Sequence, residues 1–354
     1  MLLEKKNLRS LERWNFKTTD RIGKYFRLDR NERVEKLNDK VFKNLINSIK
    51  NEYLAAYPET TEFHSLLAKK NKLNFNQVLV TTGSDTAIRH VFETFVNEKD
   101  KILTLDNTYA MYPVYAQMFG AKISYVGYDK NFKINVNQLL KKTKGIKMLI
   151  LANPNLSGQV ISEEDILKIF KYSKNKFLIL VDECYYGFYK FTQINKINNF
   201  KNLIVTRSFS KTFGIPGVRI GAAFSNSKII NKLNKVRLTH AISAPAALMG
   251  TFMIKDKSFM MNNVNEILDG KKFLINFLKE NDIKFLNTQT NFIYIKLKSL
   301  SLTKKVIMNL AKKKFLVKGP YIKPPFDNMI RITLGSKFLM KRFSQTLLNV
   351  LKKS

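Results

Sequence analysis

The chain has 354 residues, of which 45% are hydrophobic, and a single cysteine, Cys184. This length and composition exclude a globally disordered chain and fit a large domain joined to a smaller one. One cysteine excludes an intrachain disulfide and favours a reducing compartment, so we expect a cytoplasmic protein. The formal net charge is +35, but lysine is enriched along the whole sequence without a basic tail. We therefore expect a solvated basic surface and no nucleic-acid partner.

The sequence also argues against a metal site and a membrane span. His64, His90 and His240 lie far apart, and no cluster of His and Cys has the spacing of metal ligands. The longest apolar stretch, residues 241–254, is interrupted by Pro245 and by polar residues, so it predicts a buried element. The apolar stretch at the start of the chain is too short for a signal peptide.

Up to residue 205, short apolar runs alternate with amphipathic segments of helical length. This alternation is typical of an α/β fold in which helices cover both faces of a parallel sheet. Such a sheet binds its ligands at the carboxyl ends of the strands. The predicted strands are 78–81, 102–105, 123–126, 148–151, 177–181 and 203–205, and the predicted helices are 86–98, 108–119, 134–142 and 162–174.

The pattern changes after Arg219. A long helical stretch from Lys228 continues past Pro245 into a second helix, which reaches Glu280. We interpret the remainder as a smaller α+β domain, against which the first forty residues pack. Its predicted strands are 291–297, 315–318 and 329–333, and its predicted helices are 302–313 and a final one from Lys337. The predicted domains are a large one over 40–250 and a small one formed by 1–39 and 251–354.

Lys211 lies in the most informative motif of the chain. The residues from Ser208 to Arg219 read Ser-Phe-Ser-Lys-Thr-Phe-Gly-Ile-Pro-Gly-Val-Arg, so the Lys211 amine stands between two hydroxyls and eight residues before a guanidinium. An amine beside phosphate donors suits a cofactor that is an aldehyde with a phosphate group. Pyridoxal 5′-phosphate (PLP) fits this description. Because lysine is abundant in this chain, the motif alone is weak evidence for a PLP site, and it becomes informative only together with residues upstream of it.

Two upstream motifs fit the same cofactor. Gly83, Ser84 and Asp85 follow a predicted strand and open a helix, where free backbone N–H groups can bind phosphate. An ordinary capped helix start is the alternative. Asp182 ends the strand 177–181, and a carboxylate about 4 Å from the pyridine nitrogen would stabilise the protonated ring by about 4 kcal/mol at an effective dielectric near 20. A residue that caps a loop is the alternative.

Amide and aromatic side chains complete the pattern. Asn155 follows the strand 148–151 and can donate to the phenolic oxygen of the cofactor, as can the Tyr185 hydroxyl. Tyr109 stands at a junction between strand and helix and can stack on the pyridine ring. Each residue also has a structural explanation, as a polar turn or as core packing. The whole series at predicted strand ends is improbable by chance: Gly83, Tyr109, Asn155, Asp182, Lys211 and Arg219.

With these motifs, the sequence from about Leu28 to the end resembles the fold-type I PLP-dependent enzymes of the aspartate aminotransferase superfamily. It is most similar to the histidinol-phosphate aminotransferase branch, which also includes decarboxylases of amino-acid phosphates. The resemblance implies an α/β enzyme with a mainly parallel sheet in the large domain and a smaller α+β domain. It also implies that Lys211 forms a Schiff base with PLP and carries the proton between the substrate Cα and C4′ of the cofactor.

The resemblance implies a role for each residue of the cofactor site. Asp182 pairs with the pyridine nitrogen, and Tyr185 and Asn155 hold the phenolic oxygen. Tyr109 stacks on the ring. The phosphate, next to the Gly83 turn, is held by side chains or amides of Ser84, Asp85, Ser208, Ser210 and Arg219.

Substrate and partner residues follow from the same resemblance. Arg331 matches the arginine that binds the acidic group of the substrate, and Asn291 matches a small-domain position. Lys318 stands where related enzymes commonly have an arginine for the substrate phosphate; lysine keeps the charge but loses the bidentate fork. Tyr57 resembles the tyrosine that reaches the cofactor phosphate of the other subunit, so we expect an obligate homodimer.

Two departures from the family pattern have structural consequences. Leu156 replaces the proline that usually follows the asparagine, and a cis bond without proline costs about 2.5–4 kcal/mol. We therefore expect the bond from Asn155 to Leu156 to be trans in a shifted loop, or cis and strained. Residues 28–34 replace the usual Asn-Glu-Asn-Pro signature. Arg30 and Arg33 in this segment either favour another anionic substrate or belong to a solvated charged stretch.

The predicted activity is the transfer of an amino group between an amino acid and a keto acid or aldehyde, with histidinol phosphate as one candidate substrate. The alternative on the same scaffold is a PLP-dependent decarboxylase of a phosphorylated amino acid. A nucleic-acid-binding or regulatory protein is a third hypothesis, against which stands the lack of an appended DNA-binding domain.

Overall fold

The computed structural model describes residues 4–11, 21–174 and 176–353. Its largest element is a seven-stranded sheet with the strand order β2-β8-β7-β6-β5-β3-β4. Neighbouring strands are parallel except in the two pairs that involve β8. The strands are β2 (Val78–Thr81), β3 (Lys101–Leu105), β4 (Lys122–Val126), β5 (Met148–Ala152), β6 (Leu178–Asp182), β7 (Leu203–Ser208) and β8 (Gly221–Phe224).

Helices cover both faces of this sheet, because successive residues of a strand point to opposite sides. Leu149 and Leu151 of β5 pack on the side covered by α3 (Thr61–Lys70), α6 (Val136–Lys141), α7 (Glu163–Ser173) and α10 (Ala244–Lys255). Met148 and Ile150 pack on the side covered by α4 (Gly83–Phe95), α5 (Met111–Met118) and α9 (Ser227–Leu233). The continuous apolar runs in the sequence therefore result from burial on both faces.

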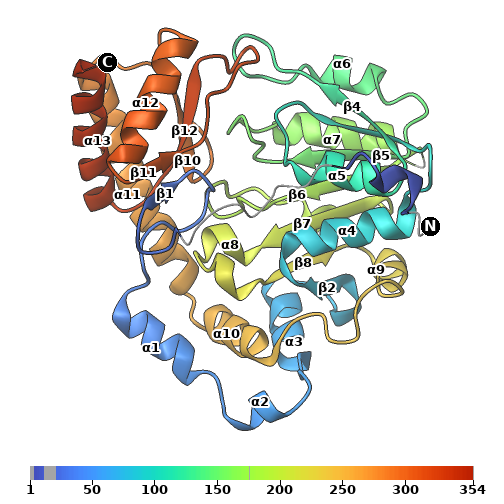
Figure 1. The fold of residues 1–354 in the computed structure, drawn as a ribbon. Helices are drawn as coiled ribbons and strands as arrows, with labels where there is room; N and C mark the ends of the chain where they lie inside the picture. The colour runs from blue at the N-terminus through green and yellow to red at the C-terminus, as the bar shows by residue number, and fades with distance from the viewer. Residues whose placement is uncertain (1–3, 12–20, 175, 354) are drawn as a thin grey trace.

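A smaller unit contains most of the C-terminal third of the chain. It has an antiparallel sheet and three longer helices, and a short parallel sheet joins β1 to β11, so that an N-terminal segment lies beside the C-terminal part (Figure 1). The elements are β1 (Phe26–Leu28), α11 (Phe259–Glu280), β9 (Phe285–Leu286), β10 (Phe292–Lys296), α12 (Leu300–Lys312), β11 (Phe315–Val317), β12 (Met329–Thr333) and α13 (Lys337–Lys352). The exact domain boundaries stay a prediction.

Several short elements complete the described structure. Two of them, α1 (Asp39–Asn47) and α2 (Glu52–Ala55), extend away from the rest of the molecule at the bottom of Figure 1. The others are α8 (Phe209–Thr212) and the 3-10 helices η1 (Lys6–Leu8), η2 (Phe75–Gln77), η3 (Ile194–Lys196) and η4 (Pro216–Val218).

The predicted α/β class and the six predicted strands are confirmed, but two parts of the sequence-based interpretation are not. The long helix from Lys228 is wrong: α9 ends at Leu233, and turns and bends lead to Ser243, whose hydroxyl caps α10. The sequence does not reveal β8, because Gly-Ala-Ala-Phe has no β-branched residue. With this strand the sheet is mixed but still mainly parallel, as the resemblance implied.

The register of the central strands determines which residues meet at one edge of the sheet. Ala152 of β5 lies opposite Asp182 of β6, and Asp182 lies opposite Thr206 of β7. Since β8 runs the other way, its first residue, Gly221, pairs with residues near the carboxyl ends of β7 and β2, Ser208 and Thr81. The loops that carry the predicted site residues therefore leave from the same edge.

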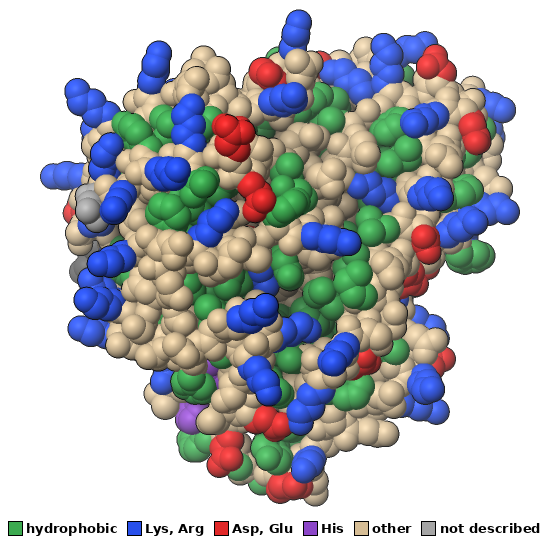
Figure 2. Space-filling view, turned by 180° about the vertical axis from the view of Figure 1, so that it is seen from behind, with side chains coloured by type: hydrophobic (Ala, Val, Ile, Leu, Met, Phe, Trp, Pro, Cys, Tyr) green, Lys and Arg blue, Asp and Glu red, His purple; other side chains and the backbone are tan. Residues whose placement is uncertain are grey.

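Basic side chains are spread over the surface. On the face shown in Figure 2, Lys and Arg are scattered over all regions, with acidic residues between them. In the described part of the chain, none of the helices combines the length and apolarity that a membrane crossing requires.

Gly270 provides a test of how α11 packs. A Cβ at this position would collide with the carbonyl oxygen of Gly335, in the loop that precedes α13. We expect Gly270→Ala to lower the free energy of unfolding by about 1–3 kcal/mol, because the backbone must shift. The control is Gly127→Ala, whose Cβ would meet no atom within 4 Å, and which we expect to change stability by less than about 0.5 kcal/mol. Urea denaturation measures both, and equal stabilities would contradict this packing.

Candidate active site

A cavity of about 390 Å³ lies at the edge where the strand ends meet. Its wall comes from both sheet units and from the segment after β1. It brings together most of the predicted site residues: Ser84, Asp85, Tyr109, Asp182, Tyr185, Ser208, Ser210, Lys211, Arg219, Lys318 and Arg331. Among the described residues, no group of His, Cys, Asp and Glu has the arrangement of a metal site.

Lys211 projects from α8, a single turn that directly follows β7. The turn begins at Ser208, whose Oγ accepts a hydrogen bond from the backbone N of Ser210 at 3.1 Å. The Lys211 amine donates to the carbonyl oxygen of Arg30 at 3.4 Å. Burial lowers the pKa of this amine, which increases the fraction present as a free nucleophile at neutral pH.

Asp182, the last residue of β6, is 3% exposed and accepts two hydrogen bonds. Tyr112 donates to its Oδ2 at 2.9 Å, and Thr206 donates to its Oδ1 at 3.2 Å. Burial raises the pKa of Asp182 to about 6. A cation within hydrogen-bond reach would stabilise the ionised form, as the protonated nitrogen of a pyridine ring would.

One end of the cavity lies where α4 begins, at Ser84 and Asp85. Gly83 has a φ of 82°, and a Cβ there would lie 2.6 Å from Nη2 of Arg219. A Cβ at Gly221 would collide with the backbone of Gly83 and Ser84. These two glycines therefore let the guanidinium lie against the free N–H groups of the helix start, which is an anion site. No carboxylate of the described residues forms an ion pair with Arg219.

The side chain of Asp85 faces two tyrosine hydroxyls. Its Oδ1 accepts hydrogen bonds from Tyr115 at 2.8 Å and from Tyr109 at 3.3 Å. The carboxylate therefore orients the ring of Tyr109, and a phosphate contact at this residue would come from its backbone N–H. The Tyr109 ring is 37% exposed at the cavity, where it can stack on a planar ligand.

Asn155 and Tyr185 each present an unused donor. Asn155 accepts at Oδ1 from the backbone N of Ser157 at 2.8 Å, and its buried Nδ2 has no partner among the described residues. The Tyr185 hydroxyl accepts from Nδ2 of Asn31 at 2.8 Å, so its own proton is available. The bond from Asn155 to Leu156 is trans; the cis bond of this turn is the one between Asn153 and Pro154. Leu156, rather than Asn155, lines the cavity itself.

Arg331 of β12 is the main cation at the opposite end. It is 8% exposed, its Nη2 donates to the carbonyl oxygen of Asp29 at 3.3 Å, and its buried Nε has no partner in the described chain. Lys318 pairs with it through the backbone, with N···O distances of 3.1 and 2.8 Å. A buried guanidinium with an unused donor is costly unless an anion binds there.

Four predicted site residues do not line this cavity. Gly83 and Asn155 directly precede residues that do, Ser84 and Leu156, whereas Asn291 and Tyr57 have other positions. Asn291 is buried behind it, where its Nδ2 donates to the carbonyl oxygen of Asn31 at 3.0 Å. Tyr57 is 81% exposed, between α2 and α3, and stacks on His240 with ring centroids 4.5 Å apart. Within one chain, Tyr57 therefore cannot serve the cavity that holds Lys211.

Other residues of the site escape sequence reasoning. Thr206 and Tyr112 donate to Asp182, and Asn31 donates to Tyr185, but the sequence analysis assigned a role to none of these three residues. Thr206 could have been identified by aligning the two predicted strands, because it lies opposite Asp182 in the register of β6 and β7. The remaining cavity residues are Arg30, Asn31, Asn107, Thr108, Ala110, Ala152, Leu156, Cys184 and Tyr321.

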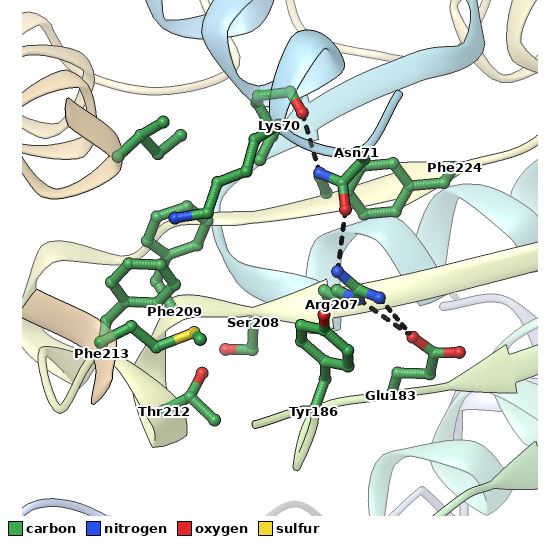
Figure 3. Close-up of a pocket in the computed structure, with 14 residues that line it drawn as sticks. Lys70, Asn71, Glu183, Tyr186, Arg207, Ser208, Phe209, Thr212, Phe213 and Phe224 are labelled. Atoms are coloured by element: carbon green, nitrogen blue, oxygen red, sulfur yellow. Dashed lines mark hydrogen bonds and ion pairs between the residues drawn. The ribbon is translucent and has the colours of Figure 1, made fainter. Parts of the chain in front are cut away.

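A second, smaller cavity of about 130 Å³ lies behind α8 and shares Ser208 with the first (Figure 3). Two charged residues of this cavity, Arg207 and Glu183, are already paired with each other. Arg207 donates to Glu183 at 3.0 Å and to Asn71 at 2.9 Å, and it stacks on the ring of Tyr186. This network braces the ends of β6 and β7. We interpret it as support for the first cavity.

Comparison with known proteins agrees with this geometry. The pattern of the family "Aminotransferase class I and II" matches residues 26–347. The chain belongs to this family. The histidinol-phosphate aminotransferase of Buchnera aphidicola subsp. Cinara cedri is 33% identical over 304 residues, which cover 82% of this chain and 85% of that protein.

Solved structures share the fold at lower identity. Histidinol-phosphate aminotransferase from Sinorhizobium meliloti, in complex with PLP, has a TM-score of 0.85 and 18% identity over 92% of this chain and 91% of that one. L-threonine-O-3-phosphate decarboxylase from Porphyromonas gingivalis has a TM-score of 0.77 and 19% identity over 92% and 99%. This chain is thus a PLP-dependent enzyme of the aminotransferase family, similar to histidinol-phosphate aminotransferases.

The cavity fits PLP on its own evidence. It contains an amine with a lowered pKa, a buried carboxylate, and an anion site at a helix start.

The raised pKa of Asp182 predicts a pH-dependent stability of the cofactor-free protein. A pKa raised from 3.8 to about 6 corresponds to about 3 kcal/mol. This stabilisation is present below pH 4 and is lost as the pH rises to 6, because the folded state binds the proton more tightly. We expect Asp182→Asn, which carries no charge, to be more stable than the wild type above pH 6 and equally stable near pH 4.

Urea denaturation of the cofactor-free proteins between pH 4 and 8 measures this difference. The same variant should bind PLP more weakly, because it offers no ion pair to the ring nitrogen. A wild type that is the more stable of the two at pH 7.5 would show that hydrogen bonds from Tyr112 and Thr206 outweigh the burial of the charge.

Proposed function

We propose that this protein transfers an amino group to or from a phosphorylated substrate such as histidinol phosphate, with an amino acid and its keto acid as the other pair. The observation that carries the proposal is that Lys211, Asp182 and Arg219 line one cavity. The buried guanidinium of Arg331 and the exposed cation Lys318, which also line that cavity, support an anionic substrate.

The residues of this chain would hold the cofactor by its ring and its phosphate. Asp182 binds the ring nitrogen, and the unused donors of Asn155 and Tyr185 bind the phenolic oxygen. Tyr109 covers the ring. The phosphate is bound by Arg219 and by the start of α4, with Ser84, Ser208 and Ser210 nearby. When bound, PLP supplies an electron sink for the negative charge that develops at the substrate Cα.

Lys211 does the proton transfer. With PLP bound, the neutral Lys211 amine would accept the proton of the substrate Cα and would then carry it, as a general acid, to C4′. General acid–base catalysis of this kind contributes roughly 10²–10⁴-fold. The lowered pKa of Lys211 suits its role as the general base, because the amine must be neutral to accept a proton.

Arg331 and Lys318 would bind the anionic end of the substrate. The Nε of Arg331 is buried and unused in the described structure, and the guanidinium lies 5.2 Å from the ring centroid of Phe292, which restricts its orientation. A phosphate or carboxylate in front of it would make charge-assisted hydrogen bonds. Lys318 adds positive charge, but its ammonium cannot bind an anion through two parallel N–H groups as a guanidinium does. Most of the directional binding therefore comes from Arg331.

A decarboxylase of a phosphorylated amino acid is the second candidate. Arg30 also lines the cavity and raises the number of cations at its substrate end to three, with Lys318 and Arg331. This number suits a substrate that has both a phosphate and a carboxylate. Release of CO₂ without transfer of the amino group would favour this activity over aminotransfer.

The test is a panel of amino acids and phosphorylated amines, with amino transfer and CO₂ measured in the same reactions. We expect transfer from histidinol phosphate and trapping of PLP on Lys211 by borohydride. Lys211→Ala should abolish the trapping. Arg331→Gln should lower kcat/KM for the phosphorylated substrate by about 10²-fold or more, because a buried charge-assisted bond is lost. Arg342→Gln, on α13, is the control. Wild-type protein that gives no trapped bond would refute the proposal.

We also propose that two copies of the chain form a dimer through the face that carries α1 and α2. Phe42, Ile46 and Leu54 on these helices are 53%, 44% and 63% exposed, and Tyr57 is 81% exposed. An apolar group of this size on segments that extend from the molecule (Figure 1) needs a partner. In such a dimer, Tyr57 of one copy would reach the phosphate end of the other.

Mixed dimers test this arrangement. Lys211→Ala copies lack the amine, and Tyr57→Ala copies lack the donated hydroxyl. We expect each variant alone to be weak or inactive, and a mixture refolded together to recover about a quarter of the wild-type activity, because half of the dimers have one complete site. No recovery in a mixture that sedimentation shows to be dimeric would exclude sharing of Tyr57.

A further inference from the structure

Residues 29–35, here called the strap, follow β1 and cross the substrate end of the cavity without regular structure. The smaller unit holds the strap at several points. The backbone N of Asn31 donates to Oγ1 of Thr333 at 2.9 Å. The Glu35 carboxylate accepts from the backbone N and Oγ of Ser336 at 2.8 and 2.6 Å. The strap is therefore a fixed part of the site.

The strap also contacts two residues of the cavity, Lys211 and Tyr185. The carbonyl oxygen of Arg30 accepts from the Lys211 amine at 3.4 Å, and Asn31 donates to the Tyr185 hydroxyl at 2.8 Å. These contacts act on side-chain ends. A separate set of contacts, through Arg33, acts on the backbone from which Lys211 projects.

Arg33 reaches α8 through one intermediate residue, Asn263 of α11. The Asn263 amide is 5% exposed, and its Nδ2 donates to the carbonyl oxygens of Lys211 at 3.3 Å and Thr212 at 2.9 Å. Its Oδ1 accepts from Nη1 of Arg33. The other arm of this guanidinium, Nη2, binds Glu266 at 2.9 Å. The side chain of Arg33 is only 15% exposed, so the bonds form in a partly desolvated place.

The two ends of the Asn263 amide make this arrangement directional. A helix of one turn leaves its last carbonyl groups without partners inside the helix, and the Nδ2 of Asn263 satisfies them. If the amide turned over, its carbonyl oxygen would face those of Lys211 and Thr212, and acceptors would repel. Arg33 has donors only, so it fixes Oδ1 on its own side and Nδ2 on the side of α8.

We propose that Arg33 is a positioning residue for Lys211: by fixing the orientation of Asn263, it holds the backbone of α8 and thereby the aim of the Lys211 amine. This inference rests on the proposed role of Lys211. A displacement of about 1 Å in a reacting group can cost 10²-fold in rate, so a change in the aim of the amine should be measurable even where PLP still binds.

Two ligands separate the aim of Lys211 from the integrity of the cavity. Pyridoxine 5′-phosphate has an alcohol where PLP has the aldehyde, so its affinity reports only on the non-covalent site. The rate at which added PLP becomes trappable by borohydride on residue 211 reports on attack by the amine. We expect Arg33→Met to lower that rate about tenfold, with less than about a threefold change in the affinity for pyridoxine 5′-phosphate.

Arg33→Lys should restore part of the rate, because lysine can still donate to Asn263. Arg342→Met is the matched control, since this arginine packs on the rings of Phe26 and Phe338 and should leave both measurements unchanged. If Arg33→Met does not fold, Arg33→Lys and Glu266→Gln carry the test, and we expect each to slow trapping while leaving the affinity unchanged.

Equal trapping rates in the wild type and in the folded Arg33 variants would overturn the inference. A parallel loss of both measurements would also overturn it, because it would assign Arg33 a general structural role. Absence of trapping at Lys211 in the wild type would instead refute the proposed function, so the two failures are distinguishable.

Discussion

The alignment of strand ends at one edge of the seven-stranded sheet is the constraint on which the active site depends. Asp182 and Thr206 are direct neighbours because β6 and β7 are parallel and in this register. Arg219 reaches the same edge for the opposite reason: it precedes β8, which runs antiparallel and therefore begins where the other strands end. A shift of one residue in either pair would turn these side chains to the other face of the sheet.

Side chains of both charge signs line the cavity. The buried carboxylate of Asp182 lines it together with cations, Arg219 beside the start of α4 and Arg331 on the smaller unit. Burial acts in opposite directions on the two kinds of group: it raises the pKa of Asp182 and lowers that of Lys211. Both shifts favour the neutral forms, and a ligand with a protonated ring nitrogen would offset the cost of ionising Asp182. The net charge of +35 attracts such anions from a distance.

Contacts between the two sheet units converge on α8. Asn263 of α11 satisfies its carbonyl groups, and Arg30 contacts the Lys211 amine. Arg331 in turn holds the strap through Asp29. The residues that would bind the substrate are thus linked by few bonds to the residue that would react with it, and the smaller unit provides nearly all of these links.

The sequence by itself determined the alternation of strands and helices, the cofactor class, and the residues at strand ends, because these depend on local patterns of burial and on side-chain chemistry. It did not determine β8, the end of α9 at Leu233, or the roles of Tyr112, Thr206, Asn31 and Asn263. Asn31 lies more than three hundred residues from its partner Thr333, and no local pattern encodes such a contact. Only the tertiary structure decided these pairings, because strand register and the packing of distant segments select one partner from many residues of the same type.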